Sequence, residues 1–376
     1  MSLATPVKVE KLQQALHAKA QASPQFRFYQ LYDKLYREDV LSHAYRLCRA
    51  NGGAPGVDGE RFEQIAEMGE QAWLEALANT LREKTYRADP VRRVWIPKAN
   101  GKQRPLGIPT IKDRVVQTAA VLVLDPIFEA DLQPEQYAYR PGRGAQAAVQ
   151  HVHRLIRNGY TEVVDADLCG YFDTIPHAEL MRSVARRIVD RQLLALIKQW
   201  LVAPVEEDDA RGHRRRTTRA KDTKRGVPQG APISPLLANL YMRRFLLGWK
   251  LLGHQRRLRG YIVNYADDFV ICCRGTAAEA METMRAMMQR LKLTVNEEKT
   301  GLRRIPVWGN YFCLGPVSKA YRAVDAHTRY RLRWWLCRKH KQPGAGTSRY
   351  PDEYLYGTLG LVCLPQRTRN LPWAKA

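Results

Sequence analysis

The order of apolar and polar positions along the chain predicts an α+β protein. Residues 1–50 and the stretch from Arg61 to roughly Lys84 have the composition and spacing of helices. The segment "RRVWIPKANGKQRPLGIP" has two extended runs around Asn100-Gly101, a dipeptide that favours tight turns, so we expect a β-hairpin there. Residues 112–128 follow a helical pattern and are expected to pack under that hairpin.

The second half of the chain repeats this mixture. Residues 161–168 have the pattern of a buried strand that ends in Asp165-Ala166-Asp167, and one helix is expected from about Pro176 to Val202. Residues 205–225, acidic first and then basic, are expected to form a charged loop. The segment "GYIVNYADDFVICC" predicts a strand, a tight turn and a second strand. One helical face follows, and its spacing favours core packing: Ala280, Met284, Met287, Met288 and Leu291.

The charge of the chain favours a polyanionic partner. The 376 residues, enough for two or three subdomains around a shared core, include 61 Lys and Arg against 37 Asp and Glu, a net charge of +24. Neutralised phosphates release condensed counterions, which makes such an excess typical of nucleic-acid binding. A solubilising surface explains the same charge, so charge alone leaves the two readings about even.

Cysteine usage and hydropathy narrow the class of protein. The seven cysteines form no CxxC pair and are odd in number, which argues against a zinc ribbon and a disulfide framework. The longest apolar stretch, Ala119 to Leu124, is far too short to span a bilayer, and the first residues have no apolar signal core. We therefore expect a cytoplasmic protein without membrane contact.

Three carboxylates carry the candidate chemistry. Asp267 and Asp268 lie between Tyr265 and Phe269 at the turn of the expected hairpin, where unpaired buried charge costs several kcal/mol. An ordinary turn is the alternative, because turns favour Asp. Asp167 also follows an apolar run, and three converging carboxylates would suit Mg²⁺. Two ions about 3.5–4 Å apart would support nucleotidyl transfer to a primer 3′-hydroxyl.

Several segments in order resemble one family. "IPKANGKQRPLGIPTIKDRVVQ", "YAYRPGRGAQAAV", "DADLCGYFDTIPH", "GVPQGAPISPLLANLYM", "YADDFV" and "LTVNEEKT" resemble the fingers and palm motifs of the reverse transcriptases encoded by group II introns, which are also intron maturases. "GGAPGVDG" resembles the N-terminal extension of that family. The resemblance implies a right-hand polymerase fold and an RNA-directed DNA polymerase. It also implies intron RNA as template, a DNA primer or target, dNTPs and two Mg²⁺ ions as partners and cofactors.

The same resemblance assigns roles to individual residues. It implies Asp167, Asp267, Asp268 and the backbone carbonyl of Leu168 as metal ligands, and Lys299 as a general acid near the pyrophosphate. An exposed structural lysine is as good an interpretation of Lys299.

For the incoming nucleotide, Lys98 and Arg104 are implied to bind the triphosphate, since lysine supplies a point charge and arginine a bidentate fork. Phe172 is implied as the steric gate that excludes a 2′-hydroxyl, and Gln229 as a contact to the new base pair. Surface charge beside a turn and a core phenylalanine are the structural alternatives.

Nucleic-acid contacts are implied for residues around these motifs and in the tail. Gly226 and Gly230 would allow close approach of the nucleic acid, with a turn before a helix as the alternative. The aromatic and basic tail suits RNA as well as it suits a solvated helix face. The implied contact residues are Tyr139, Arg140, Arg143, Gly226, Gly230, Arg333 and Lys339.

The chain departs from the family after the palm. "VNEEKTGLRRIP" runs directly into "VWGNYFCLG" at Val307, so the primer-grip strand and first part of the thumb are expected to be missing. We therefore expect an N-terminal extension (residues 1–60), fingers (61–160), palm (161–305) and a truncated thumb or maturase tail (306–376). A polymerase-impaired RNA-binding splicing cofactor is the second hypothesis. An enzyme that copies RNA into RNA is a third, against which Phe172 argues.

Overall fold

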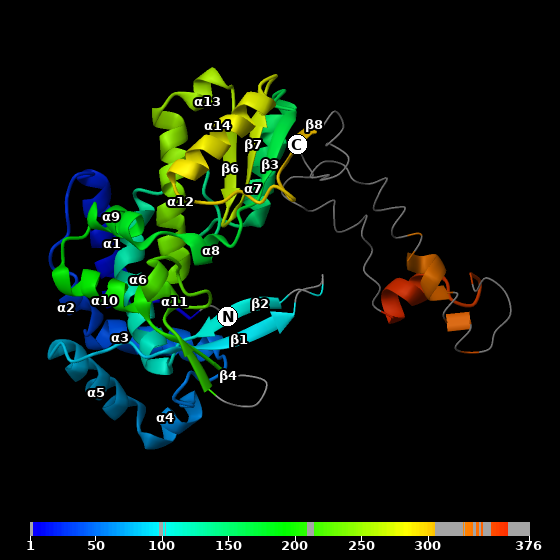
Figure 1. The fold of residues 1–376 in the computed structure, drawn as a ribbon. Helices are drawn as coiled ribbons and strands as arrows, with labels where there is room; N and C mark the ends of the chain where they lie inside the picture. Colours follow the sequence, from blue (N-terminus) through cyan, green and yellow to red (C-terminus); the bar gives the residue numbers. More distant parts are fainter. Residues whose placement is uncertain are drawn as a thin grey trace. The chain divides into compact units, whose positions relative to one another are not determined.

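The computed structural model of the chain describes residues 3–97, 101, 103–208, 214–304, 326, 328–333, 336–337, 340 and 347–359. Contacts divide the chain into a larger unit, Met1–Ala148 with Glu162–Arg303, and a smaller unit, Val149–Thr161 with Arg304–Ala376. Lys98 and Lys339 lie outside the described residues, as does the Val307 junction. Helices and strands mix throughout the larger unit (Figure 1), so the expected α+β class is confirmed.

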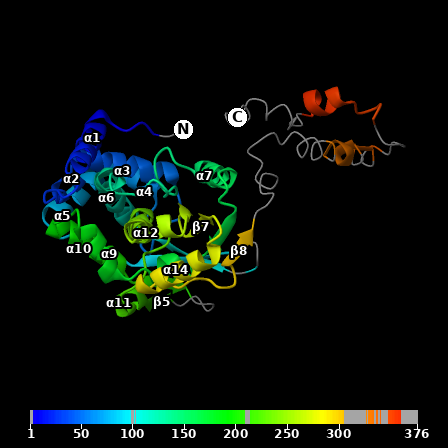
Figure 2. The ribbon, with the colours of Figure 1, turned by 90° about the horizontal axis from the view of Figure 1, so that it is seen from above.

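The first half of the chain supplies helices and one hairpin. The helices are α1 (Val7–Ala22), α2 (Tyr32–Leu35), α3 (Glu38–Asn51), α4 (Phe62–Met68), α5 (Glu70–Arg82), α6 (Ile111–Glu129) and α7 (Ala145–Arg157). The strands are β1 (Val91–Pro97) and β2 (Gln103–Ile108). Helices α1 and α3 pack on α6, and Figure 2 shows the three together. Gly69, with a φ of +104°, separates α4 from α5 within the expected helical stretch.

The second half supplies the second sheet and its helices. Its strands are β3 (Glu162–Ala166), β4 (Val205–Asp208), β5 (Arg214–Thr217), β6 (Tyr261–Tyr265), β7 (Asp268–Cys273) and β8 (Gly301–Arg304). Its helices are α8 (Tyr171–Thr174), α9 (His177–Ala185), α10 (Arg191–Val202), α11 (Arg219–Thr223), α12 (Ser234–Leu251), α13 (His254–Arg257) and α14 (Ala277–Arg290). A short π-helix, Tyr354–Thr358, lies in the smaller unit.

Two four-stranded sheets organise the larger unit. One has the order β2-β1-β4-β5 and the other β6-β7-β3-β8. The expected hairpin is confirmed, because β1 and β2 pair antiparallel from Arg92 with Ile108 to Pro97 with Gln103. Helix α14 packs on β3 and β7 (Figure 1). Its expected core face is also confirmed, since Ala280, Met284 and Met288 have no solvent exposure.

The expected charged loop at residues 205–225 is wrong over most of its length. β4 and β5 form an antiparallel hairpin in which Glu206 faces Arg216 and Glu207 faces Arg215. Opposite charges directly across a strand pair stabilise the pairing. Val205 also pairs with Val91, which attaches the hairpin to β1 in parallel. The acidic and then basic order of the segment therefore encodes two complementary strands.

The single helix expected between Pro176 and Val202 is also wrong. Ile188 forms a parallel bridge with Phe28, and the backbone bonds on either side use Phe28 N to Arg187 O (2.7 Å) and Val189 N to Phe28 O (2.8 Å). Asp190 then caps α10 by accepting bonds from the amides of Gln192 and Leu193. A tertiary bridge and a capping carboxylate thus interrupt the helix.

Candidate active site

The hairpin of β6 and β7 presents the first two carboxylates. Tyr265 and Asp268 form its last pair, so Ala266 and Asp267 make the turn. Ala266 has a φ of +58°, which is uncommon for a residue other than glycine. The buried side-chain amide of Asn264 donates to the carbonyls of Ala266 (2.8 Å) and Asp268 (3.2 Å). Asn264 therefore fixes the turn that carries Asp267.

Strand register brings the third carboxylate beside them. Asp165 pairs with Val270 and Ala166 with Phe269, so Asp167, the next residue, follows on opposite Asp268. Partial burial raises the pKa of Asp268, and the negative charges of Asp267 and Asp167 raise it further. The prediction that the strand before Asp167 lies beside the hairpin is therefore confirmed.

Lys299 and Asn296 bind one oxygen of Asp167. The distances to Asp167 Oδ2 are 2.9 Å from Lys299 Nζ and 2.8 Å from Asn296 Nδ2. The hydrogen bond and charge of Asp167 raise the pKa of Lys299. A bridge between Leu168 and Val295 holds the two segments together through the Asp167 carbonyl and the Cys169 amide. Neither of these two hydrogen bonds uses the carbonyl of Leu168.

The donor set suits a hard divalent cation. Carboxylate and carbonyl oxygens are the ligands that Mg²⁺ prefers. Burial is the main cause of the raised pKa of Asp268, and the repulsion from Asp267 and Asp167 that adds to it is one that a cation would relieve. Within the described ranges, however, no three Asp, Glu, His or Cys side chains are grouped closely enough to hold an ion. In this conformation the ammonium of Lys299 supplies the positive charge at Asp167.

A pocket of about 720 Å³ contains the described residues expected to bind the nucleotide. Arg104, Phe172 and Gln229 line it, and Arg104 Nε donates to Gln229 Oε1 at 3.3 Å. Phe172 is 8% exposed, so its ring packs in the core while it lines the pocket. The volume of this pocket is in the range typical of small-molecule sites.

Tyr139 connects this pocket to the carboxylates. It lines the pocket, it is 51% exposed, and it has a left-handed backbone with a φ of +58°. Burial of its hydroxyl raises the pKa of Tyr139, and the nearby charge of Asp267 raises it further while Arg104 lowers it. Tyr139 therefore lies within electrostatic range of both Asp267 and Arg104.

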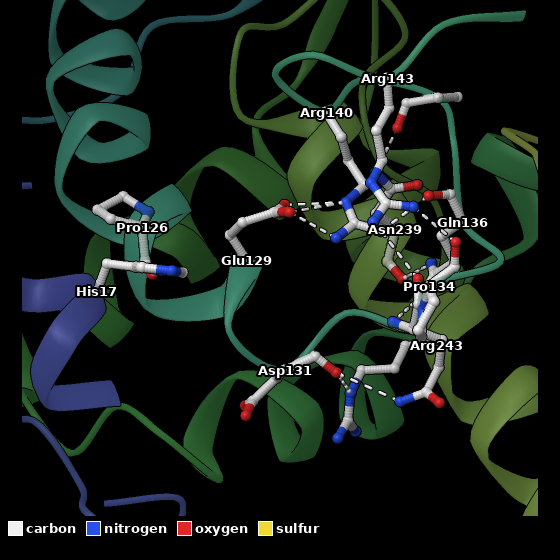
Figure 3. A network of polar contacts seen from close by, with 12 residues as sticks. His17, Pro126, Glu129, Asp131, Pro134, Gln136, Arg140, Arg143, Asn239 and Arg243 are labelled. Atoms are coloured by element: carbon white, nitrogen blue, oxygen red, sulfur yellow. Dashed lines mark hydrogen bonds and ion pairs between the residues drawn. The ribbon is translucent and has the colours of Figure 1, made fainter. Parts of the chain in front are cut away.

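Arg140, the residue after Tyr139, makes its hydrogen bonds to other groups of the protein. Figure 3 shows its guanidinium between the carboxylate of Glu129 and the backbone near Gln136. Nε donates to Glu129 Oε2 at 2.9 Å, and Nη1 donates to the carbonyls of Gln133 and Gln136, both at 2.8 Å. These bonds use the donors that a phosphate would need, so the expected template contact of Arg140 is not supported. Arg143 Nη1 donates to Pro134 O at 2.6 Å.

The segment from Glu135 to Ala138 is held against the β6–β7 hairpin and α12 by hydrogen bonds that the sequence pattern did not indicate. Gln136 Nε2 donates to Asn239 O (Figure 3), and Asn239 Nδ2 donates to Ala138 O. The backbone of Asn264 binds Glu135 O through its amide, at 2.9 Å, and Tyr137 N through its carbonyl, at 3.0 Å. Asn264 thus joins the segment to the turn of Asp267.

The expected glycines permit close approach within the protein. Gly226 and Gly230 have φ values of +99° and +101°. A Cβ on Gly230 would lie 2.5 Å from the carbonyl oxygen of Gly107 in β2, and one on Gly226 would lie 3.3 Å from the carbonyl oxygen of Asp173. Their nucleic-acid contacts remain a prediction.

The tail residue Arg333 lies in the smaller unit. It pairs with Asp352, and its Nε donates to Tyr350 O at 2.8 Å.

Within the described residues, no helix has the length and apolar character needed to cross a bilayer.

Comparison with known proteins identifies the family. The family model for "Reverse transcriptase (RNA-dependent DNA polymerase)" matches residues 96–340. Protein YkfC of Escherichia coli is 33% identical over 360 residues, covering 86% of this chain and 90% of YkfC. Group II intron-encoded protein LtrA of Lactococcus lactis is 32% identical over 230 residues, covering 60% of this chain but only 36% of LtrA.

Among solved structures, a partial Cas6-RT-Cas1–Cas2 complex matches with a TM-score of 0.41 and 23% identity, over 69% of this chain and 42% of that chain. The family match and the sequence relatives carry the assignment. The chain belongs to the reverse transcriptase (RNA-dependent DNA polymerase) family, in the group of group II intron-encoded reverse transcriptases and intron maturases.

Proposed function

We propose that this chain copies RNA into DNA by adding deoxynucleotides to a primer 3′-hydroxyl with two Mg²⁺ ions. The observation that carries the proposal is the register of β3 and β7, in which Asp167 follows on opposite Asp268. The pocket lined by Arg104, Phe172, Gln229 and Tyr139 supports it, because the charge of Asp267 raises the pKa of Tyr139 and that of Arg104 lowers it, which indicates that both lie near this side chain.

Asp167, Asp267, Asp268 and the carbonyl of Leu168 would hold the ions. Bound Mg²⁺ would activate the primer hydroxyl and neutralise charge on the leaving pyrophosphate. Asn296 orients the Asp167 carboxylate through its 2.8 Å hydrogen bond. Lys299 would leave Asp167 and donate a proton to the pyrophosphate, which its exposed side chain permits.

Arg104 and Lys98 would bind the triphosphate, and Phe172 would exclude a 2′-hydroxyl. Arg104 is exposed at the pocket, and its bond from Nε to Gln229 leaves both Nη groups available to phosphate oxygens. The buried ring of Phe172 has little freedom to move away from the sugar. Discrimination against rNTPs should therefore fall sharply in Phe172→Ala.

Primer extension on an RNA template with dNTPs and Mg²⁺ tests the proposal. We expect Asp267→Ala to lower incorporation by about 10²–10³-fold, as for loss of one preorganised electrostatic group. Asp33→Ala is the matched control, because Asp33 lies on the surface in α2. Equal incorporation by wild type and Asp267→Ala would exclude this site.

We further propose intron RNA as the template and ligand, a maturase role in splicing and mobility, and a cytoplasmic location. The net charge of +24 supports RNA binding. The proposed subdomains keep their predicted limits: extension (1–60), fingers (61–160), palm (161–305) and tail (306–376). We make one exception to these limits. Strands β4 and β5, which fall within the proposed palm by residue number, belong to the sheet of the proposed fingers.

A polymerase-impaired splicing cofactor is the second candidate. The observation in its favour is the direct passage from "VNEEKTGLRRIP" to "VWGNYFCLG", which shortens the expected thumb. Retained intron RNA binding without incorporation by wild type would favour this candidate. Long full-length cDNA would exclude it.

A further inference from the structure

Asp173, to which no role in the reaction was assigned from the sequence, lies at one end of a short chain of polar contacts. Its Oδ2 accepts a hydrogen bond from Gln229 Nε2 at 3.1 Å. The other end of the same amide, Gln229 Oε1, accepts from Arg104 Nε at 3.3 Å. The carbonyl of Gln229 is also held, because Gly107 N donates to it at 2.6 Å. Backbone and side chain of Gln229 are thus both fixed.

Gln229 lines two pockets. Arg104 and Phe172 line the pocket of about 720 Å³ described above. Asp173 lines a second pocket of about 650 Å³, and Gln229 lines both. Asp173 therefore contacts the nucleotide pocket through Gln229, so it acts at a distance from any bound triphosphate.

The chemistry of the three groups allows one orientation of the amide. An ionised carboxylate only accepts hydrogen bonds, and a guanidinium only donates them. The amide between them must turn its NH₂ towards Asp173 and its oxygen towards Arg104. If Asp173 became a donor, the amide would reverse and present its NH₂ to the NH of Arg104.

Two arginines favour the ionised form of Asp173. Partial burial raises the pKa of this carboxyl, while the guanidinium groups of Arg93 and Arg219 lower it. Both arginines line the second pocket with Asp173. Their charges support the acceptor state that the chain of contacts needs.

We propose that Asp173 is a positioning residue that sets the amide orientation of Gln229 and thereby holds the Arg104 guanidinium for the incoming triphosphate. The inference rests on the proposed function, since it assumes that this pocket takes a dNTP. Asp173 itself touches neither the substrate nor the ions.

A reciprocal exchange tests this inference. Asp173→Asn should raise the dNTP KM about 10-fold through loss of a charged hydrogen bond, with a smaller change in kcat. Gln229→Glu should be similarly impaired, because two carboxylates would then face each other. The double variant D173N/Q229E restores a donor opposite an acceptor and gives Arg104 an acceptor, at unchanged total charge. Because Gln229 is itself expected to contact the new base pair, the rescue should be partial, and we expect the KM of the double variant to be at least about 3-fold lower than that of Gln229→Glu alone.

A purely structural role for Asp173 would not give that rescue. If the double variant is no better than the worse single variant, or if Asp173→Asn leaves the dNTP KM unchanged, the inference is wrong. Lowered melting temperature in Asp173→Asn with an unchanged KM would likewise contradict it.

Binding without chemistry separates this inference from the proposed function. The probe is dTTP with Mg²⁺, titrated onto the protein bound to an RNA template with a dideoxy-terminated primer. If wild type incorporates nothing but dTTP affinity follows the exchange pattern, the proposed function fails and the Asp173 inference stands. If wild type incorporates normally but Asp173→Asn binds dTTP like wild type, only the inference fails. If wild type neither incorporates nor binds dTTP, both are wrong.

Discussion

Substitution of Gly230 by alanine should damage both stability and nucleotide binding. The φ of +101° strains any side chain, at about 1–2 kcal/mol. The new Cβ would lie 2.5 Å from the carbonyl oxygen of Gly107 and 2.8 Å from Leu106 Cδ1, and overpacking of this kind costs about 1–3 kcal/mol. The total of about 2–5 kcal/mol corresponds to a melting temperature lower by about 3–6 °C for a chain of this length.

The backbone shift that relieves this close contact in Gly230→Ala should also weaken nucleotide binding. Gly107 N binds Gln229 O at 2.6 Å, so separation of Gly230 from β2 would move Gln229 and loosen its bond to Arg104. We expect a raised dNTP KM in Gly230→Ala, measured by single-nucleotide incorporation at a temperature where the variant is folded.

Gly253→Ala is the matched control for this variant. Gly253 also has a positive φ, +76°, but a Cβ there meets no heavy atom within 4 Å. It should show the strain alone, about 1–2 kcal/mol, with unchanged nucleotide binding. Equal melting temperatures for the two variants, by circular dichroism, would refute the close contact between Gly230 and β2.

Three further predictions concern the elements around the site. Asn264→Ala removes both donors from the Asp267 turn and should lower kcat about 10-fold with little change in dNTP KM, measured by single-nucleotide incorporation. Arg140→Ala should cost about 3 kcal/mol in thermal unfolding, at the low end for a broken buried pair because Glu129 keeps 26% exposure. Its RNA affinity should stay like wild type; a larger loss of affinity than of stability would restore Arg140 as a template contact. Burial raises the pKa of Asp125 to about 6, with Glu129 adding to the shift, so its folded pKa exceeds its unfolded value of 3.8. Its stabilising contribution is full below pH 3.8 and is lost as pH rises through about 6, up to about 3 kcal/mol at neutral pH. Asp125→Asn should therefore weaken the loss of stability between pH 4 and 6 in urea unfolding, and an unchanged slope would contradict this origin.

Local sequence patterns predicted the elements that depend on local chemistry. The β1–β2 hairpin followed from Asn100-Gly101 and its flanking extended runs, and the β6–β7 hairpin from apolar residues around Asp267-Asp268. The break between α9 and α10 has no glycine or proline to announce it. It depends on Phe28, which pairs with Ile188 from 160 residues away in the chain. Such tertiary bridges leave no periodic signal.

Some residues of the candidate site could be predicted from the sequence and others could not. Acidic residues at strand ends are visible in a sequence, so the convergence of Asp167 and Asp268 could be expected. Asn264 and Asp173 act through hydrogen bonds to other protein groups, and side-chain amides and carboxylates of this kind also occur in ordinary turns. The internal use of Arg140 was missed because Glu129 precedes it by 11 residues and the intervening segment has no regular periodicity.

The attachment of β4 to β1 has a consequence for synthesis of the chain. Val91 meets its partner Val205 only after about 110 further residues have been made. Until then, one edge of β1 remains unpaired beside Trp95 and Ile96, which stay exposed even in the folded protein. An open apolar strand edge is a template for aggregation. The nascent chain should therefore be most dependent on chaperones while residues 98–205 emerge from the ribosome, and truncation before Val205 should yield insoluble protein.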